Sequence, residues 1–276
     1  MRMSHWFPLM SGGGLEYTFT GTSTFSGDPR GDWKLTLKSG GTLIFNKLNT
    51  PVDIFAVGGG AAGAKTSNNS VTGYGGNGGS GGKTALETNK SLSSGISYSV
   101  TIGAGSGSNT GTRTGGASQI MDGGTTIINA DGGSSSGWYN GANSGSGGSG
   151  GGAGGVSEGS SAGYKGGTDG SDGTGGTTKQ TGMGTSGYLV REFRQSGATI
   201  YSGGGGGGAA SDTSGSYSGA AGDSTAGRGG YKNGNGVAGK ANTGGGGGGA
   251  GYGGTSNTTS GGVGGSGIIV IRNTRA

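Results

Sequence analysis

One short stretch of the chain resembles a phosphate-binding site. Residues 78–84 read GGSGGKT, which is close to the motif G-x-x-x-x-G-K-[ST]. That motif needs a glycine where Asn77 stands, and it needs a strand directly before the loop, so that backbone N–H groups can surround a phosphate. Neither requirement is met, and near-matches arise by chance in a chain with 81 glycines. We therefore expect no nucleotide site here.

A second stretch carries residues that could bind a metal ion. Residues 166–174 read GGTDGSDGT, but Asp169 stands where a calcium-binding nonapeptide repeat has glycine, and Gly173 stands at its apolar position. Asp169 and Asp172 fit turns better than metal ligands. The chain has one histidine, His5, and no cysteine, so it offers neither a zinc site nor an evident catalytic base. We expect no metal, no cofactor and no enzymatic activity.

Aromatic side chains are the remaining candidates. They are scattered among glycines and small polar residues, a mixture that builds adaptable recognition surfaces. Packing against the outside of a glycine-rich scaffold is the alternative role, and it suits Tyr201 and Tyr252, which adjoin glycine runs. The predicted recognition residues are Tyr74, Trp138, Tyr139, Tyr164, Tyr217 and Tyr231.

Two runs of six glycines must support any such surface. A glycine run can be a flexible linker or an extended, packed helix with three residues per turn and no internal hydrogen bonds. In the packed form every buried N–H and C=O bonds to a neighbouring segment, and only residues without a Cβ let several backbones lie so close. The predicted lattice residues are Gly203, Gly204, Gly205, Gly206, Gly207, Gly208, Gly244, Gly245, Gly246, Gly247, Gly248 and Gly249.

Strand patterns precede the glycine-rich stretch. Residues 15–57 contain four strand-like runs, in which apolar residues such as Trp33, Leu35 and Leu37 alternate with polar ones, as in half-buried strands. We expect them to form a small antiparallel sheet. The last run ends at Val57 and continues directly into three glycines.

Further islands of strand character interrupt the glycine-rich stretch. They lie at residues 98–102, 125–128, 189–200 and 268–271, and the last of these is expected to close the fold. Residues 84–90 are the only candidate for a helix. We therefore divide the chain into an N-terminal docking arm (1–14), a small β-sheet domain (15–57) and a glycine-rich domain (58–276).

Composition excludes several classes of protein. With three prolines and no strict G-X-Y period, the chain is not collagen. Its formal charge of +5 is spread without a basic block, which argues against nucleic acid as a partner. No apolar run is long enough for a membrane helix, and the first ten residues lack the core of a signal peptide. Disorder is the competing interpretation of such a polar, glycine-rich chain, although 10 tyrosines and 3 tryptophans oppose it.

A combination of segments resembles the glycine-rich tail proteins of bacteriophages and prophages. The segments that carry the resemblance lie at residues 33–45, 52–60, 191–193, 199–208, 242–249 and 264–272. The resemblance implies a lattice of polyglycine-II helices, as in the glycine-rich domain of anaplastic-lymphoma-kinase-type receptors and, by composition, in T-even-type tail-fibre tip adhesins. The expected fold class is mainly β with packed polyglycine-II helices, and with almost no α-helix.

The resemblance also suggests a role. In the tail-fibre adhesins, loops between glycine motifs contact the host receptor, so we expect a virion structural protein at the tail tip or fibre that is assembled in the host cytoplasm. Its partners would be other virion proteins, through the N-terminal segment, and bacterial surface carbohydrate or protein, through loops at residues 65–74, 134–146, 163–185 and 211–235. A homo-oligomer such as a trimer is left open.

Two alternatives remain at this point. One is a purely structural virion decoration or a self-assembling surface protein that binds no receptor. The other is a ligand-binding module like that of the glycine-rich receptors, which the lack of an evident signal peptide, membrane helix and disulfide disfavours.

Overall fold

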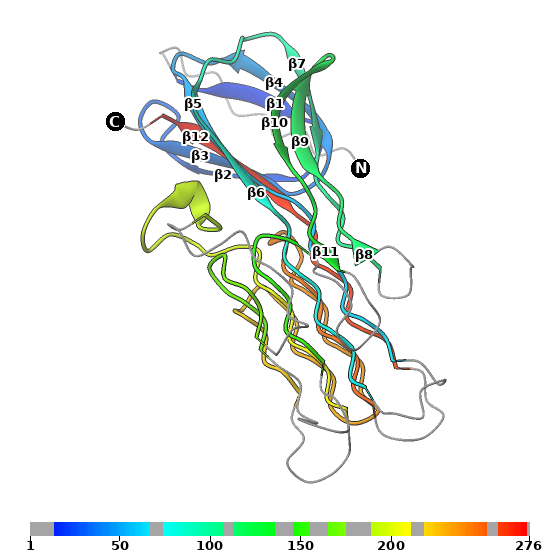
Figure 1. Cartoon of the computed structure of the whole chain (residues 1–276). Coiled ribbons are helices and arrows are strands. Elements are labelled where there is room, and N and C mark those ends of the chain that lie inside the picture. The colour runs from blue at the N-terminus through cyan, green and yellow to red at the C-terminus, as the bar shows by residue number, and fades with distance from the viewer. Residues whose placement is uncertain are drawn as a thin grey trace.

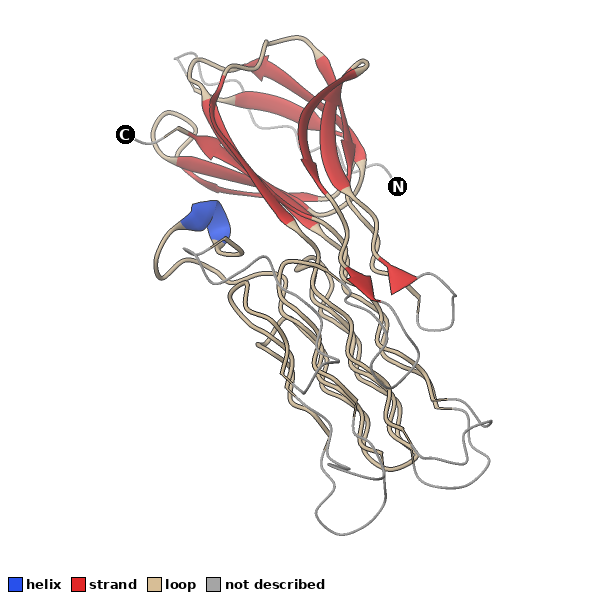
Figure 2. Cartoon of the chain, viewed as in Figure 1, coloured by secondary structure: helices blue, strands red, loops and turns tan. Residues whose placement is uncertain are grey.

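The computed structural model describes residues 14–66, 74–107, 113–135, 146–154, 165–174, 189–210, 218–252 and 259–274. Two parts follow one another along the long axis of the molecule (Figure 1). One part is a pair of β-sheets, and the other is a bundle of extended glycine-rich segments that run side by side. Figure 2 shows that these extended segments contain almost no strand or helix.

Ten strands form two five-stranded antiparallel sheets. The first sheet has the order β1-β4-β7-β9-β10 and the second has the order β2-β3-β12-β5-β6. A short ribbon of two further strands, β8 and β11, lies where the sheets meet the glycine-rich part (Figure 1). The strand bounds are β1 Glu16–Phe19, β2 Ser23–Gly27, β3 Trp33–Leu37, β4 Gly41–Lys47, β5 Val52–Val57, β6 Thr84–Lys90, β7 Ser97–Thr101, β8 Arg113–Thr114, β9 Ser118–Asp122, β10 Thr125–Ala130, β11 Ser134–Ser135 and β12 Ile268–Asn273.

The two sheets pack face to face around one apolar core. Trp33, Leu35 and Leu37 of β3 are buried at every second position, because successive side chains of a strand point to opposite faces. They share a cluster with residues of the other sheet, among them Phe45 and Tyr98, whose rings meet edge to face. The predicted alternation in residues 33–37 therefore marks the inner face of a sandwich.

The C-terminal strand lies in the centre of its sheet. β12 pairs with β3 on one side and with β5 on the other, so that Ile271 lies opposite both Leu35 and Ile54. Its apolar run fits this place, because both faces of β12 are covered. Residues 15–57 supply five of the ten strands in the two sheets, and the other five come from residues 84–130 and 268–273.

The expectation of a mainly β fold with almost no α-helix is confirmed, and two local predictions are wrong. Residues 84–90, the helix candidate, form strand β6 beside β5, because pairing with a buried strand outweighs a weak helix propensity. Residues 189–200 form no regular strand. They contain the 3-10 turn η1 (Glu192–Arg194) and one isolated bridge between Arg191 and Ile200.

The glycine-rich part is a lattice held by hydrogen bonds between segments. In residues 244–252, the N–H groups of Gly247 and Ala250 donate to residues 61 and 64, at 2.9 and 2.8 Å. Those of Gly246 and Gly249 donate to residues 203 and 206, and those of Gly248 and Gly251 donate to residues 237 and 234. Each neighbour is thus met at every third residue, which is the period of a polyproline-II-type helix.

The same central segment accepts hydrogen bonds from three other segments. The carbonyl oxygens of Gly247 and Ala250 accept from residues 79 and 76, and those of Gly245 and Gly248 accept from residues 265 and 262. Residues 227 and 230 donate to residues 246 and 249. Six segments therefore surround residues 244–252, and every polar backbone atom that faces them has a partner.

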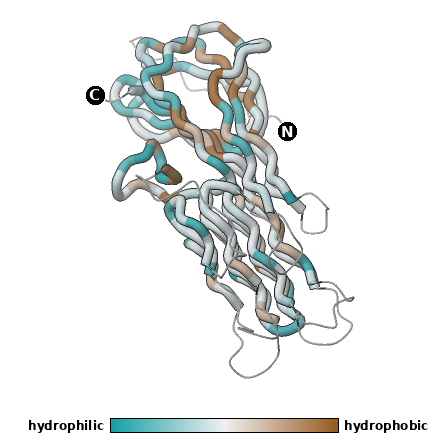
Figure 3. Tube along the Cα trace, in the orientation of Figure 1, coloured by the Kyte–Doolittle hydropathy of each residue, from teal (hydrophilic) through white to brown (hydrophobic). Residues whose placement is uncertain are grey.

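Glycine is required where these backbones pack. A Cβ added at Gly205, Gly246 or Gly247 would lie well inside 3.0 Å of a carbonyl oxygen of the next segment. Real Cβ atoms essentially never come so close, so any larger residue would push the segments apart. The pale lattice in Figure 3 reflects this composition, in contrast to the alternating hydropathy of the sheets.

Candidate functional site

The end of the lattice farthest from the sheets, here called the distal end, is where segments stop and start. At this end the N–H of Thr66 donates to the Thr259 carbonyl oxygen at 3.2 Å, and the N–H of Tyr252 donates to that of Ala209 at 2.8 Å. At the opposite end, the chain leaves β5 at Val57 and enters the lattice directly. The two ends of the described chain, near residues 15 and 274, also lie with the sheets (Figure 1).

Two of the predicted recognition residues lie at the distal end. Tyr74 precedes Gly76, whose N–H donates to Ala250 in the last layer of the lattice. Tyr231 directly follows Gly230 of the same layer, and its side chain is 48% exposed. These two tyrosines come from different lattice helices that both border residues 244–252.

The distal end also contains Tyr252, for which packing is the expected role. Tyr252 ends the central helix and is partly exposed, so it stands between the helices that lead to Tyr74 and Tyr231. Its position directly after a glycine run marks the end of a lattice helix, whereas the packing role assumed a place on the side of the lattice. The predicted recognition residues Trp138, Tyr139, Tyr164 and Tyr217 lie outside the described residues.

A buried pair of threonines fixes the layer beneath these tyrosines. The hydroxyls of Thr66 and Thr259 are 2.7 Å apart, and the Thr259 hydroxyl donates to the Gly251 carbonyl oxygen at 2.8 Å. Both threonines are almost fully buried, so each hydroxyl needs a partner inside the protein. This network ties three lattice helices together at the distal end and makes it a firm support.

A short loop packs between the lattice and the second sheet. Residues 189–202, here called the strap, fold back on themselves, and the Phe193 ring packs on Phe55 with centroids 6.0 Å apart. The Arg272 guanidinium lies 3.9 Å from the centroid of the same ring. Phe193 adopts a φ of 51°, a left-handed conformation that costs energy for a bulky residue. The strap thus holds its aromatic side chain on the outer face of the second sheet.

Ion pairs fasten the strap on both sides. Lys34 of β3 contacts Glu192 at 2.8 Å, and Arg191 forms a bidentate pair with Asp169 of the lattice at 2.9–3.0 Å. Within the second sheet, Arg272 of β12 pairs with the buried carboxylate of Asp53 of β5 at 3.1 Å. The same guanidinium also donates to Gln195 of the strap at 3.1 Å. Buried pairs of this kind hold a defined geometry even where they add little stability.

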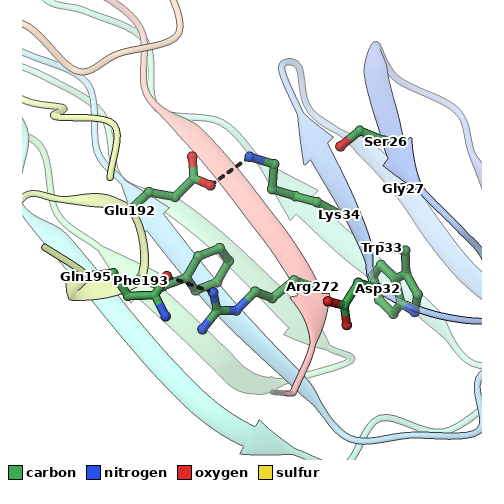
Figure 4. A pocket seen from close by; sticks show the side chains of 9 residues that line it. All are labelled: Ser26, Gly27, Asp32, Trp33, Lys34, Glu192, Phe193, Gln195 and Arg272. Atoms are coloured by element: carbon green, nitrogen blue, oxygen red, sulfur yellow. Dashed lines mark hydrogen bonds and ion pairs between the residues drawn. The ribbon is translucent and has the colours of Figure 1, made fainter. Parts of the chain in front are cut away.

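A cleft of about 200 Å³ lies between the strap and the sheet. Figure 4 shows that its walls are charged, with the contacts from Lys34 to Glu192 and from Arg272 to Gln195 crossing it. The hydroxyl of Tyr201 donates to Glu192 at 2.9 Å. Burial and the negative charge of Glu192 raise the pKa of Tyr201. Lys34 and Glu192 thus pair with each other across the cleft, and Arg272 bonds to Gln195, so these contacts connect the strap to the second sheet.

The two stretches with possible ligand chemistry are part of the scaffold. The N–H groups of Gly78, Gly79, Gly81 and Gly82 all donate to carbonyl oxygens of neighbouring segments. None of these four is available to bind a phosphate. Residues 166–174 form a hairpin in the lattice, and there Asp169 is held by Arg191.

The described residues contain neither a cluster of metal ligands nor a membrane-spanning helix. In this part of the chain, no group of three or more His, Asp or Glu side chains could hold a metal ion. Among the same residues, no helix has the length and apolar character needed to cross a membrane.

The chain matches the model of a known family. The model of a family described as a glycine-rich domain matches residues 36–274, which include all of the lattice segments and most of the sheet strands. No curated protein matches the chain. Because the match covers far more than half of the sequence, the chain belongs to this glycine-rich domain family.

Proposed function

We propose that the protein is a non-enzymatic virion protein of a phage tail tip that binds a bacterial surface receptor through the distal end of its lattice. The observation that carries the proposal is the placement of Tyr74, Tyr231 and Tyr252 at the end of a rigid lattice, opposite the sheets. The described chain ends lie with the sheets, so attachment to other virion proteins would leave the distal end exposed.

The mechanism follows from this division of roles. A lattice in which each helix bonds to several others resists bending, and binding by a rigid surface avoids the entropy cost of ordering loops. Each tip would supply a weak polar and aromatic contact. Many copies on one particle would convert weak contacts into stable attachment through effective concentration.

Open-ended self-assembly fits the lattice edge less well. The outer segments carry side chains at positions that face solvent, and Val237 and Val263 are 45% and 44% exposed. A Cβ at a close contact such as that of Gly247 would collide with the neighbouring backbone, so the valine side chains would keep another glycine helix at a distance. Sedimentation velocity separates the two cases, because a self-assembling protein forms a growing series of species and a display protein sediments as one discrete species.

Binding to whole cells tests the proposal. Purified protein is incubated with a panel of bacterial strains, and cell-bound protein is measured for wild type, for Tyr231→Ala and for Tyr252→Ala. Ile96→Ala, which changes an exposed side chain in the sheet part, is the control. We expect saturable binding to some strains that is weakened by the tip changes alone. Absence of binding to every strain, or equal weakening by the control, would refute the proposal.

A further inference from the structure

Four asparagines of the chain are followed directly by glycine, a pair that can modify itself. The glycine nitrogen attacks the side-chain carbonyl carbon of the asparagine, ammonia leaves, and a five-membered succinimide ring forms. Water then opens the ring to aspartate, or to isoaspartate, whose backbone is longer by one methylene. Glycine favours the attack because it has no Cβ to hinder the approach. The pairs lie at residues 77–78, 140–141, 233–234 and 235–236, and the second of them lies outside the described residues.

The pair at residues 77–78 is held inside the lattice. Asn77 is 3% exposed, and its side-chain oxygen accepts a hydrogen bond from the N–H of Gly154 at 2.9 Å. The N–H of Gly78 donates to the Gly152 carbonyl oxygen at 2.9 Å. Ring closure must turn the side chain and the peptide group towards each other, so it would break both bonds at a buried place, where unsatisfied polar groups are costly. We therefore expect this pair to be protected.

The pair at residues 235–236 is exposed, yet Ser260 holds both of its reacting groups. The N–H of Ser260 donates to the side-chain oxygen of Asn235 at 2.9 Å. The N–H of Gly236 donates to the carbonyl oxygen of the same serine at 3.0 Å. Because Ser260 belongs to a neighbouring lattice segment, the two segments must separate before the ring can close. The exposure of Asn235 is therefore no measure of its reactivity, since the local opening of the lattice controls it.

The pair at residues 233–234 lies in an exposed turn at the distal end and lacks both restraints. Within the described part of the chain, the exposed side chain of Asn233 has no hydrogen-bond partner. The N–H of Gly234 donates inside the turn, to the carbonyl oxygen of Tyr231 at 2.9 Å and to that of Lys232. The lattice bond of Gly234 uses its carbonyl oxygen instead, which accepts from Gly251 at 2.9 Å. Opening of this turn therefore frees the attacking nitrogen without separating lattice segments.

We propose that Asn233 is a site of spontaneous deamidation, and that the lattice protects Asn77 and Asn235 from the same reaction. The reaction consumes one water and releases one ammonia. It replaces a neutral amide with a carboxylate, which is ionised at neutral pH, so the turn beside Tyr231 gains a negative charge. The isoaspartate product also lengthens the backbone of this turn. The inference goes beyond the proposed function, because it concerns a covalent change that needs no receptor.

Peptide mapping by mass spectrometry measures the reaction at each site. The full-length protein is kept at mildly alkaline pH, which speeds ring closure by removing the proton of the attacking N–H. Samples are digested at acidic pH, and the conversion of Asn77, Asn233 and Asn235 to aspartate and isoaspartate is followed with time. A parallel sample in concentrated guanidinium gives the rates of the unfolded chain. There the three sites should react alike, because each asparagine precedes a glycine.

The comparison of the folded with the unfolded chain decides the matter. In the folded protein we expect Asn233 to react at least about tenfold faster than Asn77 and Asn235, a ratio that corresponds to about 1.4 kcal/mol in the free energy of local opening. In Asn233→Gln, whose longer side chain disfavours the five-membered ring, the product at this position should be absent. Equal rates at Asn233 and Asn235 in the folded protein would overturn the inference. Protection of Asn233 to the level of Asn77 would overturn it as well.

Discussion

A single methyl group in the lattice should be costly. Gly247 lies in the central helix, donates to Ala61 at 2.9 Å and accepts from Gly79 at 2.7 Å. In Gly247→Ala the new Cβ would collide with the Gly262 carbonyl oxygen. Overpacking of this kind costs about 1–3 kcal/mol, and two weakened hydrogen bonds add about 1 kcal/mol each.

The same substitution also has a stabilising effect, which is smaller than this cost. Replacing glycine with alanine restricts the unfolded chain and returns about 0.4–1 kcal/mol. The free energy of unfolding should therefore fall by about 2–4 kcal/mol, and the melting temperature should fall by roughly 5–15 °C. Scanning calorimetry and urea denaturation measure the two quantities.

A matched control separates this cost from a general effect of the substitution. Gly124 lies in the turn between β9 and β10, and a Cβ there would meet nothing within 4 Å. Gly124→Ala should change the free energy of unfolding by less than about 1 kcal/mol. If Gly247→Ala were no more destabilising than Gly124→Ala, the packing described for the central helix would be wrong.

Two further predictions concern the joint between the strap and the sheets. Arg272→Met should lower the free energy of unfolding by about 3–5 kcal/mol, because it removes the cationic partner of the buried Asp53 carboxylate, and adding Asp53→Asn should recover part of the loss in urea denaturation. Tyr201→Phe should cost about 0.5–1.5 kcal/mol through the lost bond to Glu192. Because the pKa of Tyr201 is raised above its usual 10.0 in the folded protein, folding keeps its proton, and stability should fall as the pH rises above 10. Urea denaturation between pH 8 and about 11 should show a shallower fall in Tyr201→Phe than in wild type, and equal slopes would contradict the assignment.

Much of the fold could be anticipated from local patterns. The alternation in residues 33–37 and the apolar run at residues 268–271 lie in strands β3 and β12. The place of β12 between β3 and β5 could not be anticipated, because a short apolar run fits any buried strand and does not specify its neighbours. Strand β9, Ser118–Asp122, was missed since its alternation is carried by Ser118 and Ile120 in a polar run.

The remaining errors have physical causes. Residues 84–90 contain alanine, leucine, glutamate and lysine, which favour a helix in isolation, yet their pairing with β5 decides their structure. The strap resembled a strand because Val190, Phe193 and Ile200 are apolar. Phe193 is buried because it packs in a cluster with Phe55 and Val57, not because it belongs to a sheet, and the periodicity of the sequence does not indicate such a contact.

The candidate site was predictable only in part. The reasoning that aromatic rings among glycines serve recognition led to Tyr74 and Tyr231, which lie at the distal end. The sequence does not distinguish a tyrosine at the end of a lattice helix from one on the side of the lattice, so packing was the expected role of Tyr252.

Amide hydrogen exchange tests the central claim most directly, because the display of a tip requires glycine runs that form a rigid support. The amides of residues 203–206, 208 and 244–249 donate to partners inside the lattice. They should exchange as slowly as the amides of strand β12, while Gly123 and Gly124 in an open turn exchange rapidly. Exchange of both glycine runs at random-coil rates would mean that they are flexible linkers, and it would contradict the lattice together with the function proposed for its distal end.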